Sequence, residues 1–517
     1  MSISKHRLLY LLVLLCWAAG QAWSAPNKSR RKVSLKVSLK EQNGTYTLKG
    51  NEVKVSNNEP WALIAPTAGV TIVSETFGVI SVKKMTNPPV LDVYVWSGAI
   101  STNWHTAGNW LVNNVVATGT PNFGFLIGNH VQIPVVGNGR YPVVTANAGA
   151  RSLTIAAGAS VAVASGGKLR VSGSDVDGVT NSGTFTNNGT TELDSAFRDG
   201  FINKAGASLV NTATFSVKNG TGSRLKNSST ITNSGTFNVY GGLSLGFYNY
   251  PGAKLLNTIS SAVFNVESAE NGGVSNEGKI DNAGTVIVKS GNTGPQFVNA
   301  DSVINRAGAT FEIKEHQDGI LLDNKKFILN EGTFRVQNGG NKGGVYNRNG
   351  AKLLNMATGA FIITSTTKTN LTNEGVIENN NLFETSYNAD SAVVNKATGS
   401  ITNNGIWSVQ GNQFAIFNQG NISLGGSATF DILSTGGSAI KNLKTFMTST
   451  GCTLKISSGS SSILNEPNAL FVNNCSTSFK YLGGPLILNK GRFTHLNGDI
   501  TAESFTSFIK NEKYMSI

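Results

Sequence analysis

Apolar and polar residues alternate in short runs along most of this chain, and the runs recur at a steady interval. In each run a large apolar residue is followed two places later by another apolar residue, with a usually polar residue between them, such as Asn238, Glu312 or Arg335. A period of two places alternate side chains on opposite faces, so each run predicts a short β-strand with one buried face. Thr385 is the exception at the second position. The first position forms a predicted core ladder: Phe215, Phe237, Phe264, Val286, Phe311, Phe334, Phe361, Phe383, Trp407, Phe430, Leu454 and Phe479.

The number of strands in one repeat follows from a clearer segment earlier in the chain. The runs at 153–155, 161–163 and 169–171 follow one another every eight residues, and three such steps equal the repeat period of about 24. We therefore predict an all-β fold, a right-handed three-sided parallel β-helix in which each repeat is one turn; the hand follows the general rule for parallel crossovers. The rival at this period is the leucine-rich repeat, which needs a helical segment that no repeat contains.

Asparagine returns once per repeat, often within an Asn-x-Gly phrase such as 181–183 or 276–278. Stacked amides can hydrogen-bond from turn to turn, and both Asn and Gly tolerate the positive φ of tight corners, so we interpret these residues as structural. The ladder is Asn181, Asn203, Asn227, Asn249, Asn276, Asn299, Asn324, Asn347, Asn373, Asn395, Asn418, Asn442, Asn465 and Asn489.

The chain begins with an export signal. Residues 1–24 combine a basic start, an apolar core and a small-x-small cleavage site ending at Ser24. We expect a small β-rich region at 25–92, an entry module and first turns at 93–180, the Asn-x-Gly repeats at 181–490, and a C-terminal cap or tail at 491–517. No later stretch is apolar enough for a membrane helix, so we expect an exported protein at the cell surface or outside the cell.

Composition supports this view. The 517 residues include 59 glycines and only 14% charged residues, which is typical of secreted β-solenoids and argues against an all-helical protein. The formal charge is +13, and the segment 26–54 alone carries a net +6, with eight basic residues against two acidic ones. This segment is a candidate for contact with an anionic surface, although such runs are more often solvated tails. An exported protein rarely meets nucleic acid, so we expect no nucleic-acid partner.

Three tryptophans introduce the repeats, in the phrases Trp96-x-Gly98, Trp104 and Asn109-Trp110. With the Asn-x-Gly repeats, this spacing resembles the entry module of repetitive secreted bacterial surface proteins, autotransporter passengers and similar β-helices, especially those of the Bacteroidetes. The resemblance implies export and an adhesive or structural role, with glycans, host or matrix surfaces, or like molecules as partners. The tryptophans themselves are expected to cap the first turn, in preference to forming a carbohydrate platform.

Two further sets of residues raise chemical hypotheses. Cys452 and Cys475 occupy equivalent places in consecutive turns, so a disulfide is expected in an oxidising compartment, with buried free thiols as the alternative. Parallel β-helices also include polysaccharide lyases and hydrolases, whose sites need stacked carboxylates beside basic residues. The nearest approach is Glu315, His316 and Asp318, which lack stacked partners. We therefore expect a non-enzymatic protein with no cofactor and no metal, and keep a polysaccharide-degrading enzyme as the alternative.

Overall fold

The computed structural model describes residues 38–42, 45–49, 70–76, 79–84, 92–124, 128–241, 244–268, 272–290, 295–315, 319–339, 342–366, 368–388, 391–434, 436–458, 461–481, 485–503, 507–512 and 515–516. The chain divides into two compact units, Met1–Leu91 and Asp92–Ile517. The first contains an antiparallel sheet in the order β1-β2-β4-β3, formed by β1 (Ser38–Gln42), β2 (Thr45–Lys49), β3 (Val70–Thr76) and β4 (Val79–Lys84), as the predicted small β region requires. The predicted leader with its cleavage at Ser24 lies outside the described residues, as does most of the segment 26–54.

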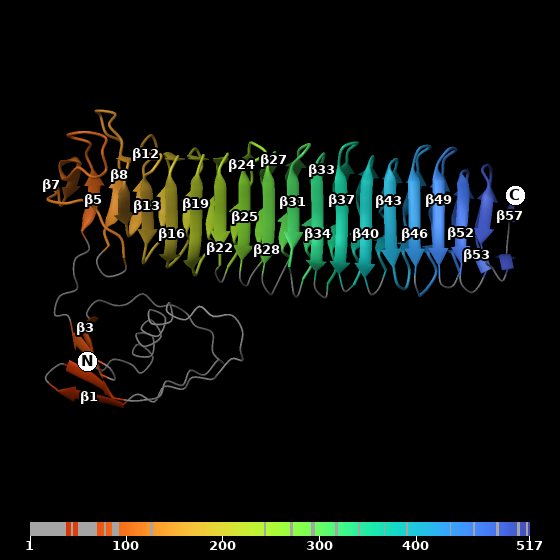
Figure 1. The fold of residues 1–517 in the computed structure, drawn as a ribbon, viewed down its shortest axis with the longest axis horizontal. Helices are drawn as coiled ribbons and strands as arrows, with labels where there is room; N and C mark the ends of the chain where they lie inside the picture. Colours follow the sequence, from red (N-terminus) through yellow and green to blue (C-terminus); the bar gives the residue numbers. More distant parts are fainter. Residues whose placement is uncertain are drawn as a thin grey trace. The chain divides into compact units, whose positions relative to one another are not determined.

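The second unit is a parallel β-solenoid with three long sheets, whose strands stand side by side in Figure 1. One coil contributes one strand to each sheet in turn, and about 24 residues complete it, which confirms the predicted architecture. Within the described part of the chain, the only helix is a single 3-10 turn, η1 (Ala107–Asn109).

The first sheet contains β5 (Val93–Trp96), β6 (Trp110–Val112), β7 (Val115–Val116), β8 (His130–Ile133), β11 (Ser152–Ile155), β14 (Val179–Asn181), β17 (Phe201–Asn203), β20 (Leu225–Asn227), β23 (Phe247–Asn249), β26 (Val274–Asn276), β29 (Phe297–Asn299), β32 (Leu322–Asn324), β35 (Val345–Asn347), β38 (Leu371–Asn373), β41 (Val393–Asn395), β44 (Ile416–Asn418), β47 (Ile440–Asn442), β50 (Ile463–Asn465), β53 (Pro485–Asn489) and β56 (Ser507–Asn511).

The second sheet contains β9 (Val143–Val144), β12 (Ser160–Val163), β15 (Thr184–Asn187), β18 (Ser208–Asn211), β21 (Thr230–Asn233), β24 (Lys254–Asn257), β27 (Lys279–Asn282), β30 (Ser302–Asn305), β33 (Phe327–Asn330), β36 (Lys352–Asn355), β39 (Val376–Asn379), β42 (Ser400–Asn403), β45 (Asn421–Leu424), β48 (Thr445–Thr448), β51 (Leu470–Asn473), β54 (Arg492–His495) and β57 (Met515–Ser516).

The third sheet contains β10 (Asn147–Ala150), β13 (Lys168–Ser172), β16 (Thr190–Ala196), β19 (Thr214–Gly220), β22 (Thr236–Tyr240), β25 (Val263–Ser268), β28 (Thr285–Ser290), β31 (Thr310–Lys314), β34 (Thr333–Gly339), β37 (Ala360–Thr366), β40 (Leu382–Asn388), β43 (Ile406–Gly411), β46 (Thr429–Ser434), β49 (Thr453–Ser458), β52 (Ser476–Tyr481) and β55 (Ile500–Glu503).

The predicted core ladder lies along the inside of the third sheet, and its members are buried. Parallel in-register pairing stacks neighbouring rings: Phe311, Phe334 and Phe361 have ring centroids 4.7 and 4.8 Å apart. Val286 and Leu454 interrupt the series of rings. The last predicted rung was wrong, because Phe479 pairs with Ile456 and Thr477 is the partner of Leu454. Thr385, the exception in the pattern, is also buried, and its hydroxyl donates to the Ser408 carbonyl oxygen at 3.5 Å. The core is therefore a continuous column that runs the length of the solenoid.

The predicted asparagine ladder forms the inner edge of the first sheet. Each side chain is fully buried and donates its amide to the asparagine of the next coil; Asn299 Nδ2 lies 2.9 Å from Asn324 Oδ1. The same amide donates to the Phe327 carbonyl oxygen at 2.9 Å, and Asn299 Oδ1 accepts from Asn276 at 2.8 Å. Both ends of the amide are thus satisfied away from water, as a buried polar group requires.

A second asparagine ladder, which was not predicted from the sequence, runs along the inside of the second sheet. Its members are also buried, and neighbouring amides lie 2.7 to 2.9 Å apart. It ends at Asn403, because the next coil carries Leu424 at this position. Its members are Asn187, Asn211, Asn233, Asn257, Asn282, Asn305, Asn330, Asn355, Asn379 and Asn403.

One part of the corner interpretation was wrong. None of the predicted ladder asparagines has a positive φ, so their amides, and not their tolerance of unusual backbone, explain them. The glycine of the Asn-x-Gly phrase is needed for space: a Cβ on Gly375 would lie 2.2 Å from the carbonyl oxygen of Ala351 in the preceding coil. The positive φ angles occur at other glycines in the turns between strands, such as Gly308 with a φ of +77°.

The N-terminal end of the solenoid is closed by the three predicted tryptophans. Trp96, Trp104 and Trp110 are buried and pack edge to face, with ring centroids 4.8 Å apart in each contact with Trp110. Strands β5, β6 and β7 pair antiparallel over this cluster, and β5 continues the ladder in parallel with β8. The rings cap the first coils, as predicted, and are too buried to serve as a binding platform.

The predicted disulfide is absent. Cys452 and Cys475 lie at equivalent corners of adjacent coils, but both are free and buried thiols. Cys475 donates to Asn473 Oδ1 at 3.5 Å. The neighbouring Cys475 thiol and burial raise the pKa of Cys452, so this thiol stays protonated. The stated alternative, a pair of buried thiols that fill the core, is what the structure contains.

Candidate functional site

The outer face of the first sheet carries aromatic and charged side chains that are bonded to one another from coil to coil. In its three-residue strands the first and last side chains point inward and the middle one points outward, which gives one outward residue per coil. Three groups of residues gather along this column and the corner that follows it. We name them clusters I, II and III.

Cluster I comprises Asp199, Lys226, Tyr248, Tyr250 and Glu277. The Tyr248 hydroxyl donates to Glu277 Oε1 at 2.6 Å, and its ring packs edge to face on Tyr250 with centroids 4.2 Å apart. Lys226 Nζ donates to Asp199 Oδ2 at 2.7 Å. The rings of Tyr248 and Tyr250 therefore lie between the carboxylates of Glu277 and Asp199, and Lys226 neutralises the charge of Asp199.

Cluster II comprises Asp323, Tyr346, Arg348 and Glu374. The Arg348 guanidinium donates to both oxygens of Asp323, at 2.7 and 3.3 Å, and lies 3.9 Å from the centre of the Tyr346 ring. The Tyr346 hydroxyl donates to Glu374 Oε1. Stacking on the ring and a two-point bond to a carboxylate fix the arginine in place.

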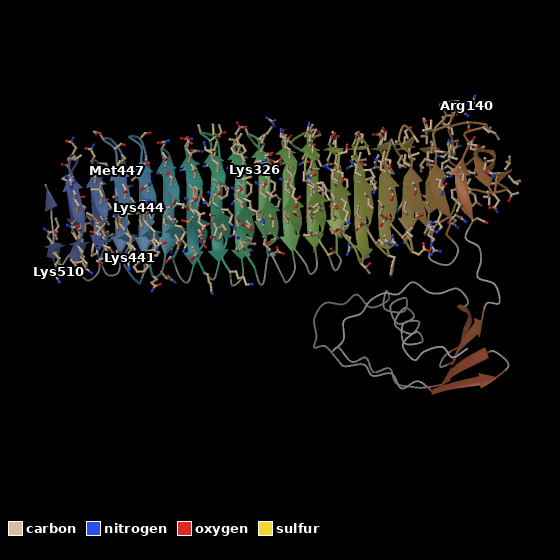
Figure 2. The ribbon with its side chains drawn as sticks, turned by 180° about the vertical axis from the view of Figure 1, so that it is seen from behind. Arg140, Lys326, Lys441, Lys444, Met447 and Lys510 are labelled. Atoms are coloured by element: carbon tan, nitrogen blue, oxygen red, sulfur yellow. The ribbon has the colours of Figure 1, made fainter. Side chains whose placement is uncertain are left out.

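Cluster III comprises Phe414, Phe417, Lys441, Glu466 and Lys490. Lys441 Nζ lies 5.6 Å from the centres of both phenylalanine rings and 3.4 Å from Glu466 Oε1. Lys490 reaches the other oxygen of the same carboxylate at 3.8 Å. Lys441 is labelled in Figure 2, towards the C-terminal end of the solenoid.

The three clusters share one arrangement and one spacing. In each, a donor in the outward column bonds to a glutamate that follows the ladder asparagine of the next coil: Tyr248 to Glu277, Tyr346 to Glu374, and Lys441 to Glu466. The donors lie on β23, β35 and β47, so successive clusters are four coils apart. At about 4.8 Å per coil the interval is about 19 Å.

The electrostatics of the clusters follow from these bonds. The hydrogen bond to Glu277 raises the pKa of Tyr248 to about 12. Burial and the hydrogen bond to Glu374 raise the pKa of Tyr346, while the bond to Asp323 raises the pKa of Arg348. All three groups keep their proton at neutral pH, so the tyrosines act as donors and each cation is matched by a carboxylate.

The residues of the predicted enzyme alternative are only partly described. His316 and Asp318 lie outside the described residues. Glu315 has a φ of +61°, is largely exposed, and lies 3.8 Å from Lys289 Nζ. The nearby Glu312 is held by Lys314 at 2.7 Å and by the Gln337 amide at 2.6 Å. The described part of this window is an ion-paired surface.

A serine, a histidine and an aspartate meet elsewhere, on the first coils. Ser152 Oγ lies 2.6 Å from His130 Nδ1, and His130 Nε2 lies 3.5 Å from Asp175 Oδ1. Asp175 also pairs with Arg151 at 3.3 Å. Ser152 is only 6% exposed, which leaves its hydroxyl little access to a substrate. Burial lowers the pKa of His130, so a neutral imidazole ties three successive coils together.

Other site chemistry is limited among the described residues. No group of three or more His, Cys, Asp or Glu side chains in these ranges could hold a metal ion. No helix in the same ranges is long and apolar enough to cross a membrane.

Comparison with known proteins adds no family. The chain matches no protein-family model and no curated protein.

The clusters were missed by sequence analysis for a physical reason. They repeat only every fourth coil, and the bonds that they share join residues 25 to 29 positions apart in the chain. A signal was present: glutamate follows the ladder asparagine at Asn276, Asn373 and Asn465. In each case the outward residue of the preceding coil is the donor. This pairing can be recognised only when the strands of the whole solenoid have been aligned in register.

Proposed function

We propose that this is an exported, non-enzymatic surface protein that acts in adhesion or in building an extracellular layer by multivalent contact. The observation that carries the proposal is the repetition of one aromatic and charged arrangement on a single face of a stiff solenoid, at intervals of four coils. Weak contacts fixed on one scaffold reinforce one another, because the second contact forms at a high effective concentration.

Export and the surface location rest on the sequence. The predicted leader at 1–24 and the resemblance of the tryptophan module and Asn-x-Gly repeats to secreted bacterial surface proteins support them. Glycans, matrix proteins and like molecules are the candidate partners. A second contact through the basic segment 26–54, with an anionic surface, is compatible with the same role.

The test is an array of glycans and matrix proteins probed with the full chain, read in parallel for the release of unsaturated sugars, which a lyase forms, and of new reducing ends, which a hydrolase forms. Binding to a restricted ligand class without turnover is expected. Product release that disappears in the triple variant Glu315→Ala, His316→Ala, Asp318→Ala would instead favour the polysaccharide-degrading enzyme. Loss of binding when tyrosines of clusters I and II are replaced would link the contact to this face.

A further inference from the structure

We propose that the outer face of the first sheet binds an uncharged polysaccharide chain lying along the solenoid axis, with clusters I, II and III as its contact points. This inference rests on the proposed function and names the face and the ligand class. The net positive charge of the whole chain would instead suggest an anionic partner, so the proposal depends on how the charges are arranged locally.

In clusters I and II each cation is matched by a carboxylate and one further carboxylate remains, whereas in cluster III Lys441 and Lys490 share Glu466. Lys226 bonds to Asp199, Arg348 to Asp323, and Lys441 to Glu466. An anionic polymer would have to displace a carboxylate from each of them and would lie close to the remaining acids, both at a cost in Coulomb energy. A polymer without charge meets neither penalty.

The groups that remain available suit sugar rings. A sugar ring has an apolar face of C–H groups and a rim of hydroxyls that both donate and accept hydrogen bonds. The partly exposed rings of Tyr248, Tyr250 and Phe417 offer apolar surface. Beside them, the carboxylates of Glu277 and Glu374 accept hydrogen bonds, with lone pairs beyond those used by the tyrosines.

The outward column between the clusters is uncharged. Between clusters I and II the outward column carries Ser275 and Val298, and between clusters II and III it carries Thr372 and Val394. All four side chains are partly exposed. A chain that lies on this column can therefore pass from one cluster to the next, about 19 Å away, without crossing an ionic side chain of the column; Lys396 lies beside the column, at the corner between clusters II and III. A monosaccharide would reach only one cluster.

The test is native affinity electrophoresis of the full chain in gels that contain a soluble polysaccharide. Mannan, dextran and xyloglucan serve as uncharged probes, and alginate, hyaluronan and heparin as anionic ones. We expect retardation by at least one uncharged polymer, with an affinity that changes less than about twofold between roughly 50 mM and 500 mM salt.

Variants assign the face. Tyr248→Ala and Tyr346→Ala are expected to weaken binding about tenfold each and still more together, because contacts are lost from a multivalent array. The matched control is Tyr240→Ala, which removes a partly exposed tyrosine from the third sheet, where Lys218 lies 6.0 Å from the ring. It should bind like the parent chain, and circular dichroism should show the same fold for all variants.

The outcomes separate this inference from the proposed function. Binding only to anionic polymers, or to matrix proteins alone, overturns the inference and leaves an adhesive role intact. Equal loss in Tyr240→Ala and Tyr248→Ala also overturns it, because the first sheet would then have no special part. No binding in either this test or the array would contradict the inference and the adhesive function together.

Discussion

The inner and outer columns of the first sheet lie on the same strands but follow different rules. The inner column is asparagine in every coil from Asn181 to Asn489, and each amide bonds to the next. The outward neighbour changes from coil to coil, from Ile202 to Lys226 to Tyr248. The same backbone register therefore carries a strict repeat inside and a varied surface outside.

The difference arises from solvent. A buried amide without partners loses the hydrogen bonds it would make with water, so one missing rung also strands its neighbours. An outward side chain remains hydrated and can change at little cost. Regularity inside thus maintains the fold, whereas the four-coil interval outside has no equivalent need in folding, which is why we associate it with function.

The largest effect is expected where an inward ring is removed. Phe334 lies between two stacked rings, and Phe334→Ala should lower the free energy of unfolding by about 3–5 kcal/mol through lost burial and a cavity. The outward neighbour Arg335 is exposed, and Arg335→Ala should change it by less than about 0.5 kcal/mol. Guanidinium denaturation followed by circular dichroism measures both. Similar losses for the two variants would mean that inside and outside do not differ in this way.

A smaller effect is expected at an internal rung of the asparagine ladder. Asn299→Ala deprives the Asn276 amide of its acceptor and Asn324 Oδ1 of its donor, which should cost about 2–3 kcal/mol. The matched control is Val298→Ala, one residue earlier and pointing outward, with an expected loss below about 1 kcal/mol. The same denaturation experiment applies. A larger loss in Val298→Ala than in Asn299→Ala would contradict the structural role of the amides.

The last rung of the second ladder, Asn403, should contribute less to stability than an internal rung. Asn403 Oδ1 accepts from Asn379 at 2.7 Å, but Leu424 stands where the next amide would be. Asn403→Ala therefore strands one amide instead of two, and we expect a loss of about 1–2 kcal/mol, less than for Asn299→Ala. If the denaturation midpoints of these two variants coincide, the bonds between rungs do not determine the cost.

Most of the fold was predictable because the inside repeats. A mostly aromatic column and an asparagine column recur from coil to coil, and the steps from Leu153 to Val161 to Leu169 give the number of sides as three. The second asparagine ladder was missed although it is nearly as regular. Its members vary in their distance from the first ladder, and only strand pairing shows that they share an inward column.

The candidate site was not predictable in the same way. The bond between Tyr248 and Glu277 crosses 29 residues and depends on the length of the intervening coil. The expected disulfide is absent for a related reason. Equivalent positions in adjacent coils bring Cys452 and Cys475 close together, but they do not determine whether the two sulfur atoms form a bond. Side-chain chemistry between coils depends on local geometry that a period alone does not contain.

The smallest effect on stability is expected in cluster I, where the outside can be examined without disturbing the inside. The hydrogen bond to Glu277 raises the pKa of Tyr248 from 10.0 to about 12. Because the folded protein holds this proton more tightly than the unfolded chain, the associated stabilisation is fully present below pH 10 and is lost as the pH rises towards 12.

Titration of tyrosinate absorbance should show a step at high pH, and Tyr248→Phe should reduce the size of this step. Glu277→Gln should move that step to lower pH, since the carboxylate charge that favours the protonated hydroxyl is gone. At neutral pH, where the bond is present, both variants should lose only a small part of the free energy of unfolding, about 1 kcal/mol or less, because the bond lies on the surface. A step at high pH that persists unchanged in Glu277→Gln would show that the bond does not hold the tyrosine, and the common arrangement of the clusters would lose its first member.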